Sequence, residues 1–220
     1  MEVVVNAAMS VDGKISNRRR DQVELSSDED FDRVDRLRAV SDCIMVGVGT
    51  VLSDDPSLAS DNGPNPVRVV VDSEARTPTD ADVLEPEGDV VVAVSDAPEE
   101  RVERLRDAGA TVLETRGDDR GRTSLAEVVD YLDEEGHDTL MVEGGGELIF
   151  SLVRDGIVDR LLVYVSPVVI GGRDSPTLVD GEGFVDDYPS LRFESVETMG
   201  EGVLLEWSFD GGSDVEEHQG

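Results

Sequence analysis

The chain has 220 residues, enough for one large domain or two small ones, and its 51 acidic against 19 basic residues give a formal net charge of −32. This balance excludes proteins that bind nucleic acids or anionic membrane surfaces through basic patches. No apolar stretch approaches the ~20 residues needed to cross a bilayer and the N-terminus lacks secretory-signal features, so we expect a cytoplasmic protein.

The acidic excess also predicts a dependence on salt. Apolar segments recur at strand and helix spacing, which favours a folded protein with an acidic surface over a disordered chain. Repulsion among surface carboxylates destabilises a compact state at low salt, whereas at ~1 M salt the Debye length falls to about 3 Å and the repulsion is screened. We therefore expect a salt-requiring, halophilic protein.

Rare residue types narrow the possible chemistry. Cys43 is the only cysteine, so no internal disulfide can form, and its apolar neighbours favour a buried structural thiol. His137 and His218 lie far apart in the sequence and match no zinc pattern, so no metal site is expected. Of the 19 basic residues 18 are arginine, and the exception, Lys14, suggests a position that requires an ammonium group.

Predicted strands and helices alternate along the chain. Ser27 with Asp30 resembles a capping box, and it opens a helix to about residue 40 with Phe31, Val34 and Leu37 on one face. Further helices are expected over 98–108 and 124–132 and after the glycines at 144–146, with a short turn or helix at 47–50. Strands are expected at 3–8, 43–47, 68–72, 90–94, 111–114, 140–142, 161–165, 191–199 and 203–209.

This alternation predicts an α/β fold with a mixed, mostly parallel sheet, helices on both faces and a C-terminal β-hairpin. No internal repeat and no composition break marks a linker, so residues 1–209 are expected to form a single domain. Residues 210–220 form an acidic, glycine-bearing tail that we expect to be disordered.

The central motif is Thr139–Glu147, in which a short apolar strand runs into three glycines and then a helix. A strand that ends in glycines at a helix start leaves backbone N–H groups unshielded, and these suit a phosphate or pyrophosphate. A tight strand-to-helix turn that is merely rich in glycine fits this stretch equally well. The spacing is not that of the dinucleotide fingerprint.

Polar groups follow the ends of four predicted strands. Lys14 lies near the end of the first strand, a hydroxyl and a carboxylate lie within 47–56, Ser73 follows the third strand, and Glu143 begins the glycine segment. The carboxyl ends of parallel strands meet at one edge of a sheet, where ligands bind. The four segments therefore predict a shared binding site.

Together these segments resemble the reductases of riboflavin biosynthesis, both the stand-alone archaeal and fungal enzymes and the reductase half of the bacterial bifunctional deaminase/reductase. The resemblance runs from about residue 2 to about 209, and the matching motifs are Asn6–Ile15, Leu37–Ala39, Gly47–Leu58, Val69–Ser73, Val142–Gly146, Leu161–Pro167 and Gly171-Gly172. It implies a dihydrofolate-reductase-like fold, NADPH as the hydride donor and a homodimer.

The resemblance also implies an activity. The chain lacks the His-x-Glu and Pro-Cys-x-x-Cys zinc motif of the deaminase half, so it is similar to the stand-alone reductase. The implied reaction is NADPH-dependent reduction of the ribosylamino group of 2,5-diamino-6-ribosylamino-4(3H)-pyrimidinone 5′-phosphate to a ribityl chain. Two alternatives are a pterin reductase of the same fold and a nucleotide-binding protein that has lost activity.

The resemblance also implies site residues, which are the residues of this chain at the matching positions of the family motifs. Lys14 and Glu143 are the implied catalytic residues, and Glu143 would either bind the amino groups of the ring or manage a proton. The bacterial pattern has an arginine where this chain has Asp61, so Arg18–Arg20 or Arg173 would contact the substrate phosphate instead. The implied substrate-binding residues are Lys14, Arg38, Leu58 and Glu143, and the implied cofactor-binding residues are Thr50, Asp54, Ser73, Gly145, Gly146 and Glu147, with Arg76 for the 2′-phosphate.

Overall fold

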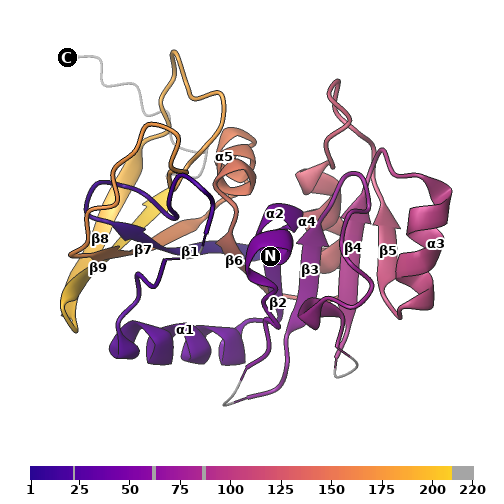
Figure 1. Ribbon diagram of the computed structural model, residues 1–220, viewed down its shortest axis with the longest axis horizontal. Coiled ribbons are helices and arrows are strands. Elements are labelled where there is room, and N and C mark those ends of the chain that lie inside the picture. Colours follow the sequence, from indigo (N-terminus) through magenta and orange to yellow (C-terminus); the bar gives the residue numbers. More distant parts are fainter. Residues whose placement is uncertain (22, 61–62, 86–87, 210–220) are drawn as a thin grey trace, which may run out of the picture.

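Nine strands form one sheet in the computed structural model, which describes residues 1–21, 23–60, 63–85 and 88–209 (Figure 1). Their order is β5-β4-β3-β2-β6-β1-β7-β9-β8, which confirms every predicted strand. Valine-rich runs form the inner strands because helices cover both of their faces. The strands are β1 (Glu2–Ser10), β2 (Cys43–Gly47), β3 (Val67–Val71), β4 (Val90–Val94), β5 (Thr111–Glu114), β6 (Thr139–Gly144), β7 (Arg160–Ser166), β8 (Leu191–Met199) and β9 (Gly202–Phe209).

The first seven strands pair in parallel, and the predicted C-terminal hairpin adds two antiparallel strands through β7. Ser27 and Ser124 cap two of the helices, each accepting a hydrogen bond from the backbone N–H three residues on. The helices of the described residues are α1 (Asp28–Val40), α2 (Val48–Asp54), α3 (Glu99–Asp107), α4 (Leu125–Glu134) and α5 (Gly146–Arg154), with a short 3₁₀ helix, η1 (Asp82–Leu84).

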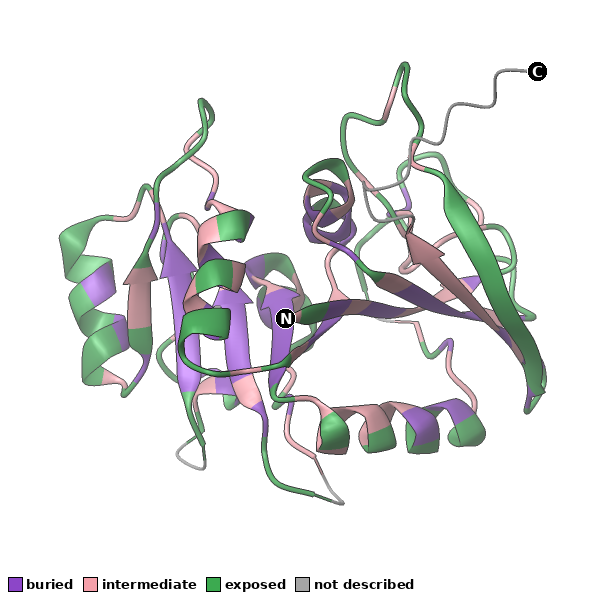
Figure 2. Cartoon of the chain, turned by 180° about the vertical axis from the view of Figure 1, so that it is seen from behind, coloured by how far each residue is buried: buried purple, intermediate pink, exposed green. Residues whose placement is uncertain are grey.

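Two apolar layers cover the two faces of the sheet (Figures 1 and 2). On one face α4 and α5 pack Leu132 and Leu152 against the strands. On the other face α2 and α3 bury Val51 and Leu105, and α1 adds the partly buried Leu37. The prediction of helices on both faces is confirmed.

The inward face of α1 differs from the prediction. Phe31 is 50% exposed, whereas Asp30 and Arg33 are buried and form an ion pair of 2.6 Å. On the exposed side of the same turn, the Gly200 N–H at the tip of the C-terminal hairpin donates to the Glu29 carboxylate at 2.5 Å. Phe31 faces a cleft instead of the core.

None of the helices in the described part of the chain has the length and hydropathy of a bilayer-spanning segment. The cytoplasmic location and the single domain over residues 1–209 stay predictions. The predicted disordered tail, residues 210–220, and Asp61 lie outside the described residues.

Candidate active site

An open cleft of about 1640 Å³ runs along the carboxyl ends of the parallel strands. This volume exceeds the ~300–1,000 Å³ typical of a site for one small ligand, so it has room for a dinucleotide and a second molecule. Segments after β1, β2, β3, β4 and β6 contribute to its lining, as the position of ligands in parallel sheets leads one to expect. All the residues predicted to hold the cofactor line it: Thr50, Asp54, Ser73, Arg76, Gly145, Gly146 and Glu147.

The glycine segment forms the entry to α5 at the floor of this cleft. Gly145 has φ +93°, a conformation that favours glycine, and a Cβ at Gly146 would lie 2.5 Å from the Thr177 carbonyl oxygen. No side chain caps α5, so the N–H groups of its first turn are open to a ligand in the cleft. The uncapped turn fits the pyrophosphate of a dinucleotide, whereas the crowding at Gly146 is a packing contact with the segment that follows β7.

Glu143 is placed in the cleft by a fork of two hydrogen bonds. Arg38 Nε donates to Glu143 Oε1 at 2.7 Å and Arg38 Nη2 donates to Oε2 at 2.6 Å. The Glu143 side chain is 8% exposed, and that of Arg38 is 26% exposed. The structure thus brings together two residues that were predicted separately, one from β6 and the other from the last turn of α1.

Of the four predicted substrate-binding residues, Glu143 is among those that line the cleft, whereas Arg38, Lys14 and Leu58 are not. Lys14 Nζ donates to the Ser175 carbonyl at 2.9 Å, while the next residue, Ile15, does line the cleft. Leu58 is 1% exposed and packs in the core on the side of α2 and α3. Their roles toward the substrate stay predictions.

Asp12 joins two of the matching motifs. Its carboxylate accepts hydrogen bonds from Ser10 Oγ at 2.7 Å and from the N–H groups of Ile170 and Gly171 at 3.0 and 2.8 Å. The Ser10 hydroxyl, followed by these backbone donors, lowers the pKa of Asp12 to about 2. The carboxylate is therefore ionised throughout the physiological range and holds the turn before Lys14 against the Gly171-Gly172 turn.

Cys43 does not take part in the site. It is fully buried, and burial raises the pKa of its thiol to about 12. Cys43 is therefore a buried structural thiol, as its apolar neighbours in the sequence indicate.

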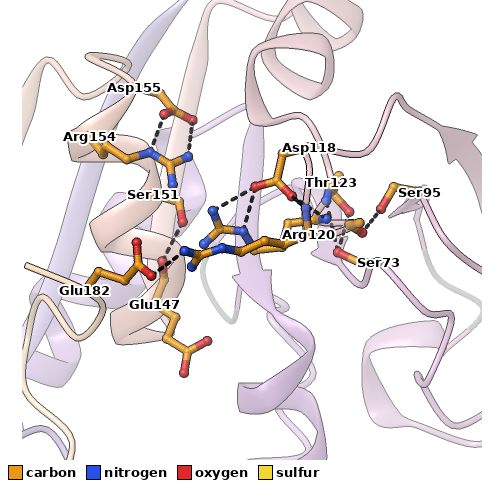
Figure 3. Close-up of polar contacts among 12 residues, drawn as sticks. Ser73, Ser95, Asp118, Arg120, Thr123, Glu147, Ser151, Arg154, Asp155 and Glu182 are labelled. Carbon is orange, nitrogen blue, oxygen red and sulfur yellow. Dashed lines mark hydrogen bonds and ion pairs between the residues drawn. The ribbon is translucent and has the colours of Figure 1, made fainter.

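The loop between β5 and α4 also lines the cleft, and sequence reasoning missed it. Thr123 Oγ1 lies 3.0 Å from Ser73 Oγ, and Ser95 Oγ donates to the Gly121 carbonyl at 2.6 Å, so the loop is attached to the ends of β3 and β4 (Figure 3). The available signal was three arginines, at 116, 120 and 122, directly after a strand of a chain in which basic residues are scarce.

Comparisons with known proteins agree with this geometry. A family model described as the RibD C-terminal domain matches residues 1–205. A protein of Archaeoglobus fulgidus named 2,5-diamino-6-ribosylamino-4(3H)-pyrimidinone 5′-phosphate reductase is 44% identical over an alignment of 221 positions that covers 94% of this chain and 98% of the relative.

Two solved structures share the fold. A deaminase/reductase of Thermotoga maritima superimposes with a TM-score of 0.78 at 24% identity, and the match covers 95% of this chain but only 56% of that longer chain. A dihydrofolate reductase of Enterococcus faecalis superimposes with a TM-score of 0.53 at 13% identity over 95% of this chain and 96% of its own. The predicted dihydrofolate-reductase-like fold is confirmed, and the chain belongs to the RibD C-terminal domain family.

Proposed function

We propose that this chain uses NADPH to reduce the ribosylamino group of 2,5-diamino-6-ribosylamino-4(3H)-pyrimidinone 5′-phosphate to the ribitylamino product. The observation that carries the proposal is one cleft in which the glycine entry to α5 and the Glu143 carboxylate both face the same space. The 44% identity to a reductase of that name supports the choice of substrate.

The proposed reaction needs alignment more than it needs a reactive side chain. The ribosylamine opens to its imine, a hydride adds to the first sugar carbon and a proton adds to the nitrogen. NADPH supplies the hydride when bound, and the chain must hold the two carbons together and exclude water. Glu143, fixed by Arg38, either binds amino groups of the ring or delivers the proton.

The test is NADPH oxidation at ~2 M potassium chloride with the diamino and the deaminated pyrimidine measured side by side. We expect turnover with both the cofactor and the diamino substrate present, and a higher kcat/KM for the diamino compound. Preference for the deaminated compound would contradict the substrate. NADPH binding without any turnover would favour the non-catalytic alternative, and turnover of a dihydropterin would favour the pterin reductase.

Lys14 gives a test of the substrate side. We expect Lys14→Ala to lower kcat/KM by about tenfold or more while NADPH affinity stays unchanged, because the ammonium is proposed to face the phosphorylated substrate. Lys14→Arg, which keeps the charge, is the control and should retain part of the activity. Unchanged turnover in Lys14→Ala would leave Lys14 as a tether to the Ser175 carbonyl and nothing more.

We also propose that the chain forms a homodimer through its C-terminal hairpin. β8 is an edge strand that is exposed along almost its whole length, as Figure 2 shows. A bulge between Phe193 and Ser195 keeps its apolar side chains on the face that carries Trp207. The hairpin stripe, formed by Leu191, Phe193 and Val196, is 40%, 57% and 57% exposed. Exposed apolar edges of this kind mark interaction surfaces.

Phe193→Asp should convert the dimer into a monomer, because it places a carboxylate in the centre of the hairpin stripe. Light scattering after size exclusion at ~2 M potassium chloride measures the mass directly. Arg192→Asp is the matched control, since it adds a carboxylate to the neighbouring residue of the same strand, which points to the other face. A wild type that is monomeric at ~100 μM would contradict the dimer.

A further inference from the structure

We infer that Arg120 binds a phosphate group of the dinucleotide and that Glu182 holds its guanidinium in place until the dinucleotide arrives. Arg120 Nη2 lies 2.5 Å from Glu182 Oε1, and this ion pair links the β5–α4 loop to the segment that follows β7 (Figure 3). The inference rests on the proposed function, because it assumes that the cleft receives a nicotinamide dinucleotide.

The loop that carries Arg120 is a fixed turn. Asp118 accepts hydrogen bonds from the N–H groups of Arg120 and Arg122 at 2.8 and 2.9 Å and from Arg122 Nε at 2.7 Å. The Arg122 N–H, then the Arg122 side chain, lowers the pKa of Asp118 to about 2, so the turn stays closed at neutral pH. With Ser73 and Ser95 bonded to the end of the loop, the backbone of Arg120 is held at the rim of the cleft.

The partners of the three loop arginines separate Arg120 from the other two. Arg116 pairs with Glu127 of α4, directly after the loop, and Arg122 pairs with Asp118 within the loop. Both pairs are local and hold the loop together. All three arginines line the cleft, but Arg120 instead reaches a residue of a different segment.

Glu182 is positioned by packing against α5. A Cβ at Gly181 would lie 2.5 Å from the Phe150 ring, and the rings of Phe150 and Phe184 are 5.2 Å apart between centroids. The Asp180 N–H donates to the Gly146 carbonyl at 3.1 Å, so this segment touches the glycine entry to α5. The segment that carries Glu182 is therefore anchored beside the glycine entry to α5, whose N–H groups suit a pyrophosphate.

Arg120 can exchange the Glu182 carboxylate for a phosphate at little cost in free energy. The Arg120 and Glu182 side chains are 57% and 64% exposed, and an exposed ion pair stabilises a protein little, so its opening costs little free energy. A guanidinium makes the same forked contact with a phosphate as with a carboxylate.

The two partners of this ion pair should have opposite effects on binding. We expect Arg120→Gln to weaken NADPH binding about tenfold, through loss of a charged hydrogen bond, and Glu182→Gln to strengthen it about two- to threefold, because Arg120 is released. Calorimetric titration without the pyrimidine, at the lowest salt that keeps the wild type folded by circular dichroism, measures both. An equal loss for NADPH and NADH assigns Arg120 to the pyrophosphate, and a loss confined to NADPH assigns it to the 2′-phosphate.

Arg106→Gln and Glu114→Gln are the matched controls, since this exposed pair lies at 2.6 Å on α3 and β5 outside the cleft. They correct for the general effect of removing one charge from an acidic protein. If Arg120→Gln and Glu182→Gln both weaken binding, or neither differs from its control, the ion pair is structural and the inference is wrong. If the wild type binds neither dinucleotide, the proposed function fails and the inference fails with it.

Discussion

Transfer from ~2 M to ~0.1 M potassium chloride should unfold this protein. The net charge of −32 must be accommodated by one folded chain, and the Debye length grows from less than about 3 Å to about 10 Å over this range, so repulsion between neighbouring carboxylates is screened much less. The same salt weakens attractive ion pairs, but exposed pairs contribute only about 0–1 kcal/mol each. Repulsion outweighs them because acidic residues outnumber basic ones 51 to 19. Circular dichroism across a salt series measures the transition.

The way in which stability depends on salt concentration identifies the cause of the salt requirement. Screening is nearly complete once the Debye length reaches about 3 Å near 1 M, so stability should rise steeply up to that point and then level off. A rise that continues in proportion to salt would instead indicate stronger burial of apolar surface. Stability that is independent of salt would contradict the prediction outright.

Charge variants of the surface provide a second check. Neutralising exposed carboxylates outside the cleft should lower the salt concentration needed for folding, and Arg36→Gln, which removes an exposed cation, should raise it. A loss of specific contacts would move both variants in the same direction. A suitable set of neutral substitutions is Asp32→Asn, Glu103→Gln, Asp107→Asn and Glu134→Gln.

The strands were predictable because their signal is local. Val90–Val94 is a run of five apolar residues, all of them buried, which a central parallel strand requires. The glycines at 144–146 likewise indicate a turn from a strand into a helix. The carboxyl ends of parallel strands must meet at one edge of the sheet. Local pattern together with one topological rule was therefore enough to bring the four strand ends to one edge, whereas the individual cofactor residues were implied by the family resemblance.

Contacts between side chains from distant segments were not predictable in the same way. The helical period placed Phe31 inward on α1, yet Asp30 and Arg33 are the buried residues of that turn, where they form an ion pair, and Glu29 contacts the distant hairpin tip. The pairing of Arg120 with Glu182 depends on the relative positions of two segments that lie far apart in the sequence, the β5–α4 loop and the segment after β7. In a chain so rich in carboxylates, spacing alone does not tell which carboxylate meets which arginine.

Arg38→Met and Glu143→Gln should both lower kcat/KM, the second by ~10²-fold or more, because the Glu143 carboxylate lines the cleft and Arg38 holds it there. The two roles left open for Glu143 separate in the kinetics of Glu143→Gln. A fall in kcat indicates that it delivers the proton, whereas a rise in KM with kcat unchanged indicates that it binds the amino groups of the ring. Arg38 acts through Glu143, so Arg38→Lys, which cannot form the fork, should restore only part of the activity.

The ion pair between Arg38 and Glu143 should also contribute to the free energy of unfolding. Arg38→Met leaves the carboxylate of Glu143, 8% exposed, without this partner, and breaking a buried pair costs about 3–5 kcal/mol. Because Arg38 is 26% exposed, solvent screens part of this, and we expect about 2 kcal/mol with a coupling of about 1–2 kcal/mol in the double-mutant cycle. The control is Arg160→Met with Glu206→Gln, a part-buried pair between β7 and β9 outside the cleft. It should show coupling in denaturant unfolding at ~2 M potassium chloride but leave turnover unchanged. Turnover that falls equally in both cycles would mean that Glu143 acts through stability alone.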